Sequence, residues 1–168
     1  MREIAPRRFR AELGLYYEDF QVGDTYEHRP GRTITAADNI QFSLMTMNLH
    51  PLHCDEHFAN QSEFGQMLVN SGLTIAIVLG MTVPEISGQA IANLGFQNIR
   101  LTNPVFAGDT IYAESEVLRL RPSKSRPGQG IVMVRTRGLK HDGTEFMTFE
   151  RSALVRSRAE AEANPTNY

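Results

Sequence analysis

The pattern of hydrophobic and polar residues divides the chain into a first half with helical periodicity and a second half typical of strands. Four segments of the second half are rich in β-branched and aromatic residues: 90–101, 110–118, 130–140 and 145–155. Turn signals separate these segments, and the run His-Asp-Gly at 141–143 is typical of a hairpin turn. We therefore expect four long strands that can run antiparallel.

The first half begins with an expected strand at residues 24–32 and continues with helices. Thr35, followed three positions later by Asp38, has the form of a capping box at a helix start. Apolar residues then recur at helical spacing, at Ile40, Leu44 and Met47. Pro51 ends this helix, because proline disfavours helical geometry in the residue before it. A short helix is expected at residues 55–60.

The segment at residues 71–81 is apolar all round, which is typical of a helix buried on every side. Asn70 or Ser71 can cap its first turn. Small residues recur every four positions at Gly72, Ala76 and Gly80, and form a stripe where a sheet could approach closely or a ligand could lie. An antiparallel sheet wrapped around a central helix, an α+β architecture, is the expected assembly. Because such a sheet has open edges, we expect a homodimer, which could associate further.

Composition narrows the class of protein. The chain has 168 residues, of which 41% are hydrophobic, as expected of one soluble globular domain. Its net charge of −2 provides no basic field for nucleic acid or anionic membranes. The longest apolar run, at residues 73–81, is too short to cross a bilayer, and the charged N-terminus argues against a secretory signal. A single cysteine, Cys54, cannot form an internal disulfide, so we expect a cytoplasmic location.

The same pattern suggests three parts. Residues 1–14 are interpreted as an N-terminal arm, residues 15–157 as the domain, and residues 158–168 as a flexible polar tail.

A cluster of histidines is the first candidate for chemistry. His50, His53 and His57 lie within eight positions, together with Asp55. They could be solvated loop residues, an acid/base apparatus or zinc ligands. We expect no metal, because a proline interrupts the set and the remaining histidines are isolated in the sequence. A nucleophile pair of Cys54 with its neighbour is not expected either, because adjacent side chains seldom point at each other.

Several motifs give the chain a resemblance to the MaoC-like dehydratases, a hot dog-fold family that includes (R)-specific enoyl-CoA hydratases. The hydratase motif of that family corresponds to residues 46–53, and the entry to its central helix corresponds to Phe64 and residues 69–71. The run NPVFAGDTIYAESEV at 103–117 matches a strand pair of the family. The resemblance covers roughly residues 16–155. The segments ANLGF and SRPGQGIV are more similar to the branch that hydrates small branched or dicarboxylic acyl-CoAs, such as mesaconyl-CoA hydratases.

The chain departs from the family motif at two places. The catalytic aspartate of the family falls at Asn48, and the asparagine of its motif falls at His50. The family's His-Gly pair at the helix start is Asn70-Ser71 here.

The resemblance implies a hydro-lyase that adds water reversibly to an enoyl-CoA. His53 would be the general base, Asn48 would orient the water, and the backbone N–H of Ser71 would stabilise the thioester oxyanion. His50 is the favoured acid partner, with Asp55 as a second candidate that could instead only cap the short helix.

Substrate contacts are expected at Asn70 and Gly72 beside the oxyanion site. Arg121, Lys124 and Arg126 could bind the phosphates of coenzyme A, although they could equally be an exposed charged loop. Coenzyme A would be part of the substrate, and no other cofactor is expected.

Two other functions remain open. A hot dog-fold thioesterase would also use an acid or base near a helix N-terminus. A non-catalytic acyl-CoA-binding subunit is suggested by Asn48, since an amide cannot exchange protons as a carboxylate does.

Overall fold

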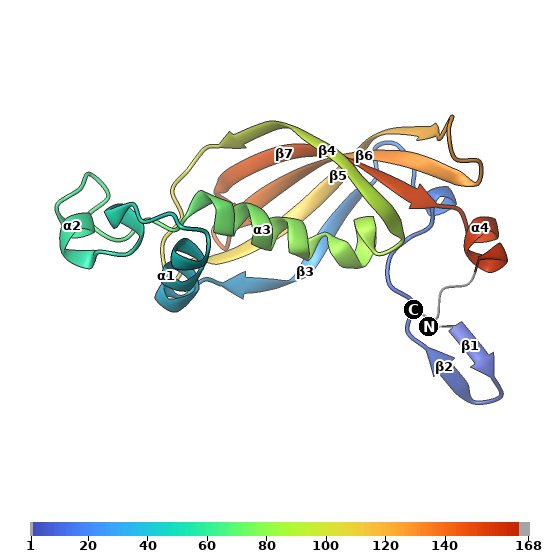
Figure 1. Cartoon of the computed structure of the whole chain (residues 1–168), viewed down its shortest axis with the longest axis horizontal. Coiled ribbons are helices and arrows are strands. Elements are labelled where there is room, and N and C mark those ends of the chain that lie inside the picture. Colours follow the sequence, from blue (N-terminus) through green and yellow to red (C-terminus); the bar gives the residue numbers. More distant parts are fainter. Residues whose placement is uncertain (1, 165–168) are drawn as a thin grey trace.

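Strands with one apolar face form the body of the molecule, which we describe from a computed structural model covering residues 2–164. Buried and exposed side chains alternate along the three central strands: β5 (Thr110–Pro122), β6 (Gln129–Lys140) and β7 (Glu145–Arg156). With β3 (Thr25–Thr33) and β4 (Ala90–Leu101) they form one antiparallel sheet in the order β3-β5-β6-β7-β4 (Figure 1). The four predicted long strands and the earlier strand are confirmed.

The sheet curves around helix α3 (Ser71–Met81), which is followed by a π-helical turn, η3 (Val83–Ser87) (Figure 1). Two apolar clusters fill the space between sheet and helix. One follows α3 and includes Leu73 and Val78, and the other surrounds Ile86 beyond the end of α3. The predicted α+β architecture, with an antiparallel sheet wrapped around a helix, is therefore confirmed.

The composition of α3 predicted a helix that is buried on every side, and this prediction is wrong. Leu73, Thr74 and Val78 face the sheet and are buried, whereas Ala76 and Gly80 face solvent. A Cβ added at Gly80 would meet no atom within 4 Å. The stripe of small residues therefore does not serve close packing against the sheet of the same chain.

Helices α1 (Ala36–Met45) and α2 (Glu56–Asn60) project from the end of the sheet at which α3 begins (Figure 1). A short 3-10 turn, η2 (Pro51–His53), lies between them. The capping box predicted at Thr35 is present, because its hydroxyl accepts from the Asp38 N–H while the Asp38 carboxylate accepts from the Thr35 N–H. We call residues 36–69 the overhang.

The helix predicted at these residues is present, but its apolar residues do not mark its buried face. Leu44 and Met47 are exposed, and the buried residues of the helix are Asn39 and Ser43. The helix therefore turns a polar face toward the body, and the candidate site explains why.

The segments outside the predicted domain also have regular structure. Strands β1 (Arg2–Ala5) and β2 (Arg8–Arg10) form a hairpin that stands off the body (Figure 1). A 3-10 turn, η1 (Tyr17–Asp19), lies at the start of the predicted domain. Within the segment predicted as a tail lies α4 (Arg158–Ala163), whose first turn is capped by the hydroxyl of Ser157. Residues 165–168 of that segment lie outside the described part. Over residues 2–164, no helix is long and apolar enough to span a membrane.

The edge strand β4 carries large apolar side chains that are half exposed. They are Ile91 (43%), Leu94 (50%), Phe96 (39%), Ile99 (48%) and Leu101 (52%). Since β4 pairs with β7 on one side only, its other backbone edge is unpaired within residues 2–164.

Candidate active site

His53 lies in the turn η2, and its ring is fixed by a backbone carbonyl. Its Nδ1 lies 2.8 Å from the carbonyl oxygen of Leu68. Because a carbonyl oxygen only accepts hydrogen bonds, Nδ1 carries the proton in this contact and Nε2 of the neutral ring keeps its lone pair. No hydrogen bond to Nε2 is formed within residues 2–164. The structure therefore presents His53 with a free basic nitrogen.

Asn39, which the sequence analysis missed, ties His53 to the start of α3. Its side-chain amide donates to the carbonyl oxygens of His53 (2.9 Å) and Leu68 (3.1 Å). Its Oδ1 accepts from the backbone N–H of Asn70 at 2.8 Å. Asn39 is only 1% exposed, and without it the His53 carbonyl and the Asn70 N–H would lose these partners, whereas the Leu68 carbonyl would keep its contact with the His53 ring. This explains why α1 turns a polar face inward.

His50 lies beside His53 with complementary hydrogen-bonding character. Its Nδ1 accepts from the Leu52 N–H at 3.2 Å, which places the proton of the neutral ring on Nε2. The centroids of the two imidazole rings are 6.0 Å apart. Asn48 is close by in the chain, and its Oδ1 accepts from the His50 N–H at 3.4 Å. The loop thus presents one imidazole as an acceptor and its neighbour as a donor.

The remaining polar residues of the cluster have local roles. Asp55 caps α2 by accepting from the Phe58 N–H at 3.0 Å. His57 is exposed on α2 and contacts Gln61. The Cys54 thiol lies 3.7 Å from the His50 carbonyl oxygen. No group of three potential metal ligands converges in the described chain.

Ser71 is the first residue of helix α3, and its backbone N–H lies at the helix N-terminus, where the helix dipole favours negative charge. The N-cap Asn70 uses its Oδ1 to accept from the Gly72 N–H at 2.9 Å, and its own carbonyl accepts from the N–H groups of Leu73 and Thr74. The Ser71 N–H has no hydrogen-bond partner within the described residues. It is therefore available to a ligand, and anions at such positions are stabilised.

A pocket of about 260 Å³ opens beside this N–H group. Its walls come from the overhang, the first turn of α3 and the segment that follows β4, and include Phe64, Leu68, Ser71, Thr74 and Val105. His53 is not among the described residues that line it. It reaches the wall indirectly, because its ring is bonded to the carbonyl of Leu68. Within one chain, Leu68 thus both holds the imidazole and lines the pocket that contains the Ser71 amide.

The residues predicted to contact the substrate do not all lie at the pocket beside Ser71. Asn70 is buried as the helix cap, and the N–H of Gly72 is already occupied by that cap. Arg121, Lys124 and Arg126 lie at or near the turn between β5 and β6, at the end of the sheet opposite Ser71 (Figure 1). A contact of these side chains with coenzyme A at Ser71 of the same chain is therefore not supported.

A second hollow, of about 660 Å³, follows the solvent-facing side of α3. It is lined mainly by apolar side chains, including Phe42, Ile77 and Met81, and also by Ala76 and Gly80. The stripe of small residues therefore borders a groove, which is the other interpretation that the sequence allowed.

A buried polar cluster lies near the far end of α3. His28 is fully buried, and its Nδ1 donates to the Glu85 carboxylate at 2.6 Å while its Nε2 lies 2.8 Å from the Ser115 hydroxyl. Thr136 extends this chain of hydroxyl groups. Burial lowers the pKa of His28 below its ordinary value, an effect that the Glu85 carboxylate opposes. Burial likewise lowers the pKa of Arg151 to about 10.

Comparison with known proteins identifies relatives of this chain in sequence and in structure. Residues 19–138 match the family described as MaoC like domain. Mesaconyl-CoA hydratase of Cereibacter sphaeroides is 34% identical over 156 residues, which are 93% of this chain and 45% of that protein. The structure of a putative MaoC domain protein dehydratase from Chloroflexus aurantiacus superposes with a TM-score of 0.84 at 32% identity, covering 90% of this chain and 43% of that one.

A conserved hypothetical protein of Mycobacterium tuberculosis, described as having a double hotdog fold, establishes the fold. It superposes with a TM-score of 0.77 at 22% identity, over 86% of this chain and 44% of that one. The predicted hot dog fold is confirmed. The chain spans less than half the length of each of these three proteins.

Proposed function

The chain belongs to the MaoC-like domain family. We therefore propose that it is a hydro-lyase acting on the double bond of a short, branched or dicarboxylic enoyl-CoA. One observation carries this proposal. The ring of His53, with Nε2 free, is hydrogen-bonded through Nδ1 to the carbonyl of Leu68, which lines the same pocket as the free N–H of Ser71. A base and an oxyanion donor are thereby held close to one pocket. The name of the relative mesaconyl-CoA hydratase supports the substrate class.

The chemistry follows from these positions. His53 Nε2 takes a proton from water as the water oxygen bonds to the β-carbon of the substrate. The electrons of the double bond move toward the thioester oxygen, where the Ser71 N–H stabilises the negative charge. Proton transfer to the α-carbon then completes the addition, and His50, whose Nε2 carries a proton, is the donor we favour. The proton that His53 took from water passes to His50 in the same step, so both imidazoles end neutral.

Asn48 acts in this proposal by orientation. Its Oδ1 is engaged by the His50 N–H, while its amide nitrogen has no protein partner in the part of the chain described. The amide can therefore donate to the attacking water without exchanging a proton.

The active form in this proposal is a homodimer paired through β4. The unpaired edge and the half-exposed apolar residues of β4 are the surfaces that such pairing would cover. Coenzyme A enters only as part of the substrate, no metal takes part, and the unpaired Cys54 suits a cytoplasmic location.

The test is direct. Purified protein is mixed with crotonyl-CoA and with mesaconyl-CoA, and loss of the conjugated double bond is followed by absorbance. We expect consumption of at least one substrate, and a loss of about 100- to 10,000-fold in kcat for His53→Ala. His57→Ala, which changes an exposed histidine of the same segment, should retain full activity. Failure to hydrate any short enoyl-CoA would overturn the proposal.

Assays with the same purified protein and substrates distinguish the proposed function from two alternatives. A thioesterase would release free coenzyme A, which a thiol reagent detects, whereas a hydratase leaves the thioester intact. A binding subunit would be inactive as isolated, and Asn48→Asp would then create activity from none. We expect instead that the wild-type protein is active and that Asn48→Asp changes kcat by less than about tenfold, since the base is retained.

A further inference from the structure

The candidate active site has almost no positive charge of its own. Residues 33–99, which include the overhang and α3, contain neither lysine nor arginine. The nearby cations are engaged: Lys140 pairs with Asp109 at 2.8 Å, and Arg32 pairs with Asp38 at 2.6 Å. A coenzyme A molecule carries several phosphate charges, so its nucleotide end has no obvious binding group at this end of the same chain.

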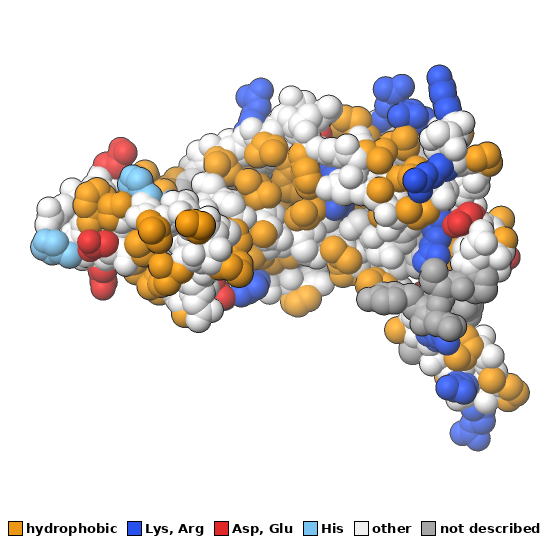
Figure 2. All heavy atoms as spheres, viewed as in Figure 1, with side chains coloured by type: hydrophobic (Ala, Val, Ile, Leu, Met, Phe, Trp, Pro, Cys, Tyr) orange, Lys and Arg blue, Asp and Glu red, His pale blue; other side chains and the backbone are white. Residues whose placement is uncertain are grey.

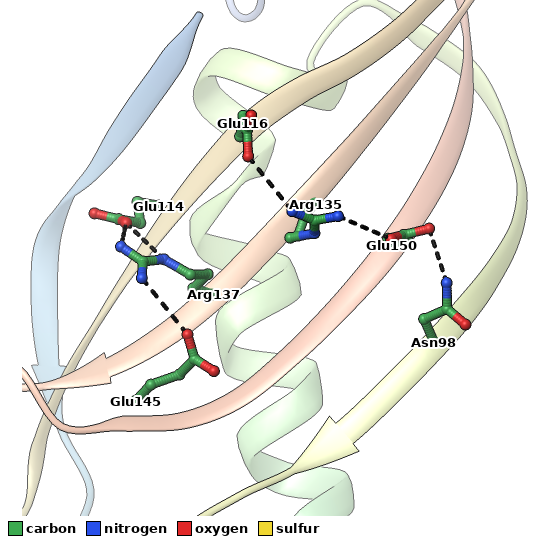
Figure 3. A network of polar contacts seen from close by, with 7 residues as sticks. All are labelled: Asn98, Glu114, Glu116, Arg135, Arg137, Glu145 and Glu150. Carbon is green, nitrogen blue, oxygen red and sulfur yellow. Dashed lines mark hydrogen bonds and ion pairs between the residues drawn. The ribbon is translucent and has the colours of Figure 1, made fainter. Parts of the chain in front are cut away.

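The outer face of the sheet does not provide one either. There Arg137 is paired with Glu114 and Glu145, and Arg135 with Glu116 and Glu150, on the side of the sheet turned away from α3 (Figure 3). The remaining cation of this region is Arg100, on β4. It lies opposite Thr148 in the strand register, and therefore projects from the same outer face.

Free cations gather at the other end of the molecule. Arg121, Lys124 and Arg126 are exposed, and none has a carboxylate partner within residues 2–164. We call these three residues the basic turn. β5, with 13 residues, connects the two ends, so the basic turn lies roughly 40 Å from the end at which α3 begins. Figure 2 shows the same polarity, with Lys and Arg side chains mostly at the end opposite the histidines of the overhang.

Pairing of β4 with a second copy would bring the basic turn of one protomer close to the pocket of the other. If β4 meets its copy antiparallel about a twofold axis, each protomer is turned end for end relative to the other. The β5–β6 end of one copy then lies beside the α3 N-terminal end of the other. β4 ends at Leu101, and the pocket beside Ser71 is lined by the residues from 101 to 105 that follow. The pocket of one protomer therefore opens near the shared edge.

The distances fit a single ligand. In sheet order, β6 is the third strand counted from the shared edge, so its turn lies roughly 15 Å across the sheet from the partner's β4. The register places the start of β6 level with the start of β4, because Gly130 and Ala90 both lie opposite Val155. The basic turn thus lies just beyond the sheet end that would meet the partner's pocket.

We propose that the phosphates of coenzyme A, with its thioester at Ser71 of one protomer, are bound by the basic turn of the second copy. This inference rests on the proposed function and on the dimer through β4. It assigns Arg121, Lys124 and Arg126 a role in the neighbouring site, and it makes each site incomplete in a single chain.

Kinetics with two thioesters test the phosphate contact. The variant Arg121→Gln/Lys124→Gln/Arg126→Gln should raise KM for the coenzyme A ester about ten- to a hundredfold with kcat retained, since charge-assisted contacts to phosphate are lost. The N-acetylcysteamine thioester of the same acid has no phosphate, and its KM should not change. Arg29→Gln, which neutralises an exposed arginine on the distant strand β3, is the control and should leave both KM values unchanged. An unchanged KM for the coenzyme A ester in the triple variant would overturn the proposal.

Mixed dimers test whether the contact crosses the interface. His53→Ala chains keep the basic turn, and triple-variant chains keep the base, so only a mixed dimer would combine both in one site. Co-expressed in equal amounts, the two chains should give two kinetic components. About one quarter of the wild-type kcat should appear at the wild-type KM, because half of the dimers are mixed and each has one complete site, and about another quarter should appear at the raised KM from the triple-variant homodimers. Recovery at the raised KM only would show that the basic turn acts within its own chain, and would overturn the proposal.

Calorimetry separates this proposal from the proposed function. If no enoyl-CoA is hydrated, titration with free coenzyme A still measures the phosphate site. Binding to wild type that weakens about tenfold or more in the triple variant would support the site without the reaction. Equal binding by both proteins, or a protein that remains monomeric at assay concentrations, would end the proposal whether or not hydration is observed.

Discussion

The side-chain amide of Asn39 donates a hydrogen bond to the backbone carbonyl of His53 over 2.9 Å. The same buried side chain bonds to Leu68 and Asn70, so it joins the loop of the proposed base to the first turn of the central helix. The separation between base and oxyanion donor is therefore set largely by one asparagine of α1.

Asn39→Ala should destabilise the protein by about 3 kcal/mol, because the His53 carbonyl and the Asn70 N–H lose their side-chain partner and the Leu68 carbonyl loses one of two. The free energy of unfolding in urea measures this change. Gln41→Ala, at an exposed position of the same helix, is the matched control and should change stability by less than about 0.5 kcal/mol. Equal effects of the two substitutions would show that the Asn39 contacts do not support the fold.

Ser71→Pro should remove the oxyanion donor and leave the fold intact. Proline is well tolerated at the first position of a helix, and Asn70 before it already has the extended ψ of 126° that proline requires. Loss of this one N–H should lower kcat about 100- to 1,000-fold. Ser71→Ala keeps the N–H and should retain activity within a few-fold. A proline variant with normal kcat would exclude the Ser71 amide as the donor.

Leu94→Lys should dissociate the proposed dimer. A lysine in the middle of the half-exposed edge strand would be buried without a partner on pairing, so we expect the dissociation constant to rise at least about a hundredfold. Analytical ultracentrifugation over a dilution series measures it. Val22→Lys, at an exposed position outside the sheet, should leave the dimer unchanged. Unaltered association of the Leu94 variant would place the interface elsewhere.

His28 should make the protein less stable in mild acid. Its pKa is lowered in the folded state, chiefly by burial, so the unfolded chain binds a proton first as pH falls below about 6.5. The free energy of unfolding should therefore fall through this range until the folded-state pKa is reached, by about 1.4 kcal/mol for each unit of difference. The loss between pH 7.5 and 5.5 should be smaller in His28→Gln and unchanged in His141→Gln, which alters an exposed turn. Identical pH profiles for all three proteins would contradict the assignment.

The strands and helix starts could be predicted because their signals are local. The capping box of Thr35 and Asp38 and the apolar segments of the second half are visible in a few neighbouring residues. The face of α1 could not be predicted in this way. Its burial depends on backbone carbonyls of residues 53 and 68, which lie far away in the sequence. A polar pair four residues apart, Asn39 and Ser43, was the available signal.

The candidate site residues could be named from the sequence, but the contacts that hold them could not. The resemblance pointed to His53 and Ser71, and the structure adds the Leu68 carbonyl that fixes the ring of His53. Where the basic turn lies relative to Ser71 depends on strand order and direction, which no short motif encodes.

The open edge of β4 has a further consequence for how such domains are assembled. Two separate chains meet only at sufficient concentration, whereas two domains joined by a tether meet at an effective concentration fixed by its length. On dilution, the first arrangement would lose its composite sites together with its quaternary structure, and the tethered one would keep them. The unpaired edge of β4 would thus make the proposed activity of separate chains depend on protein concentration.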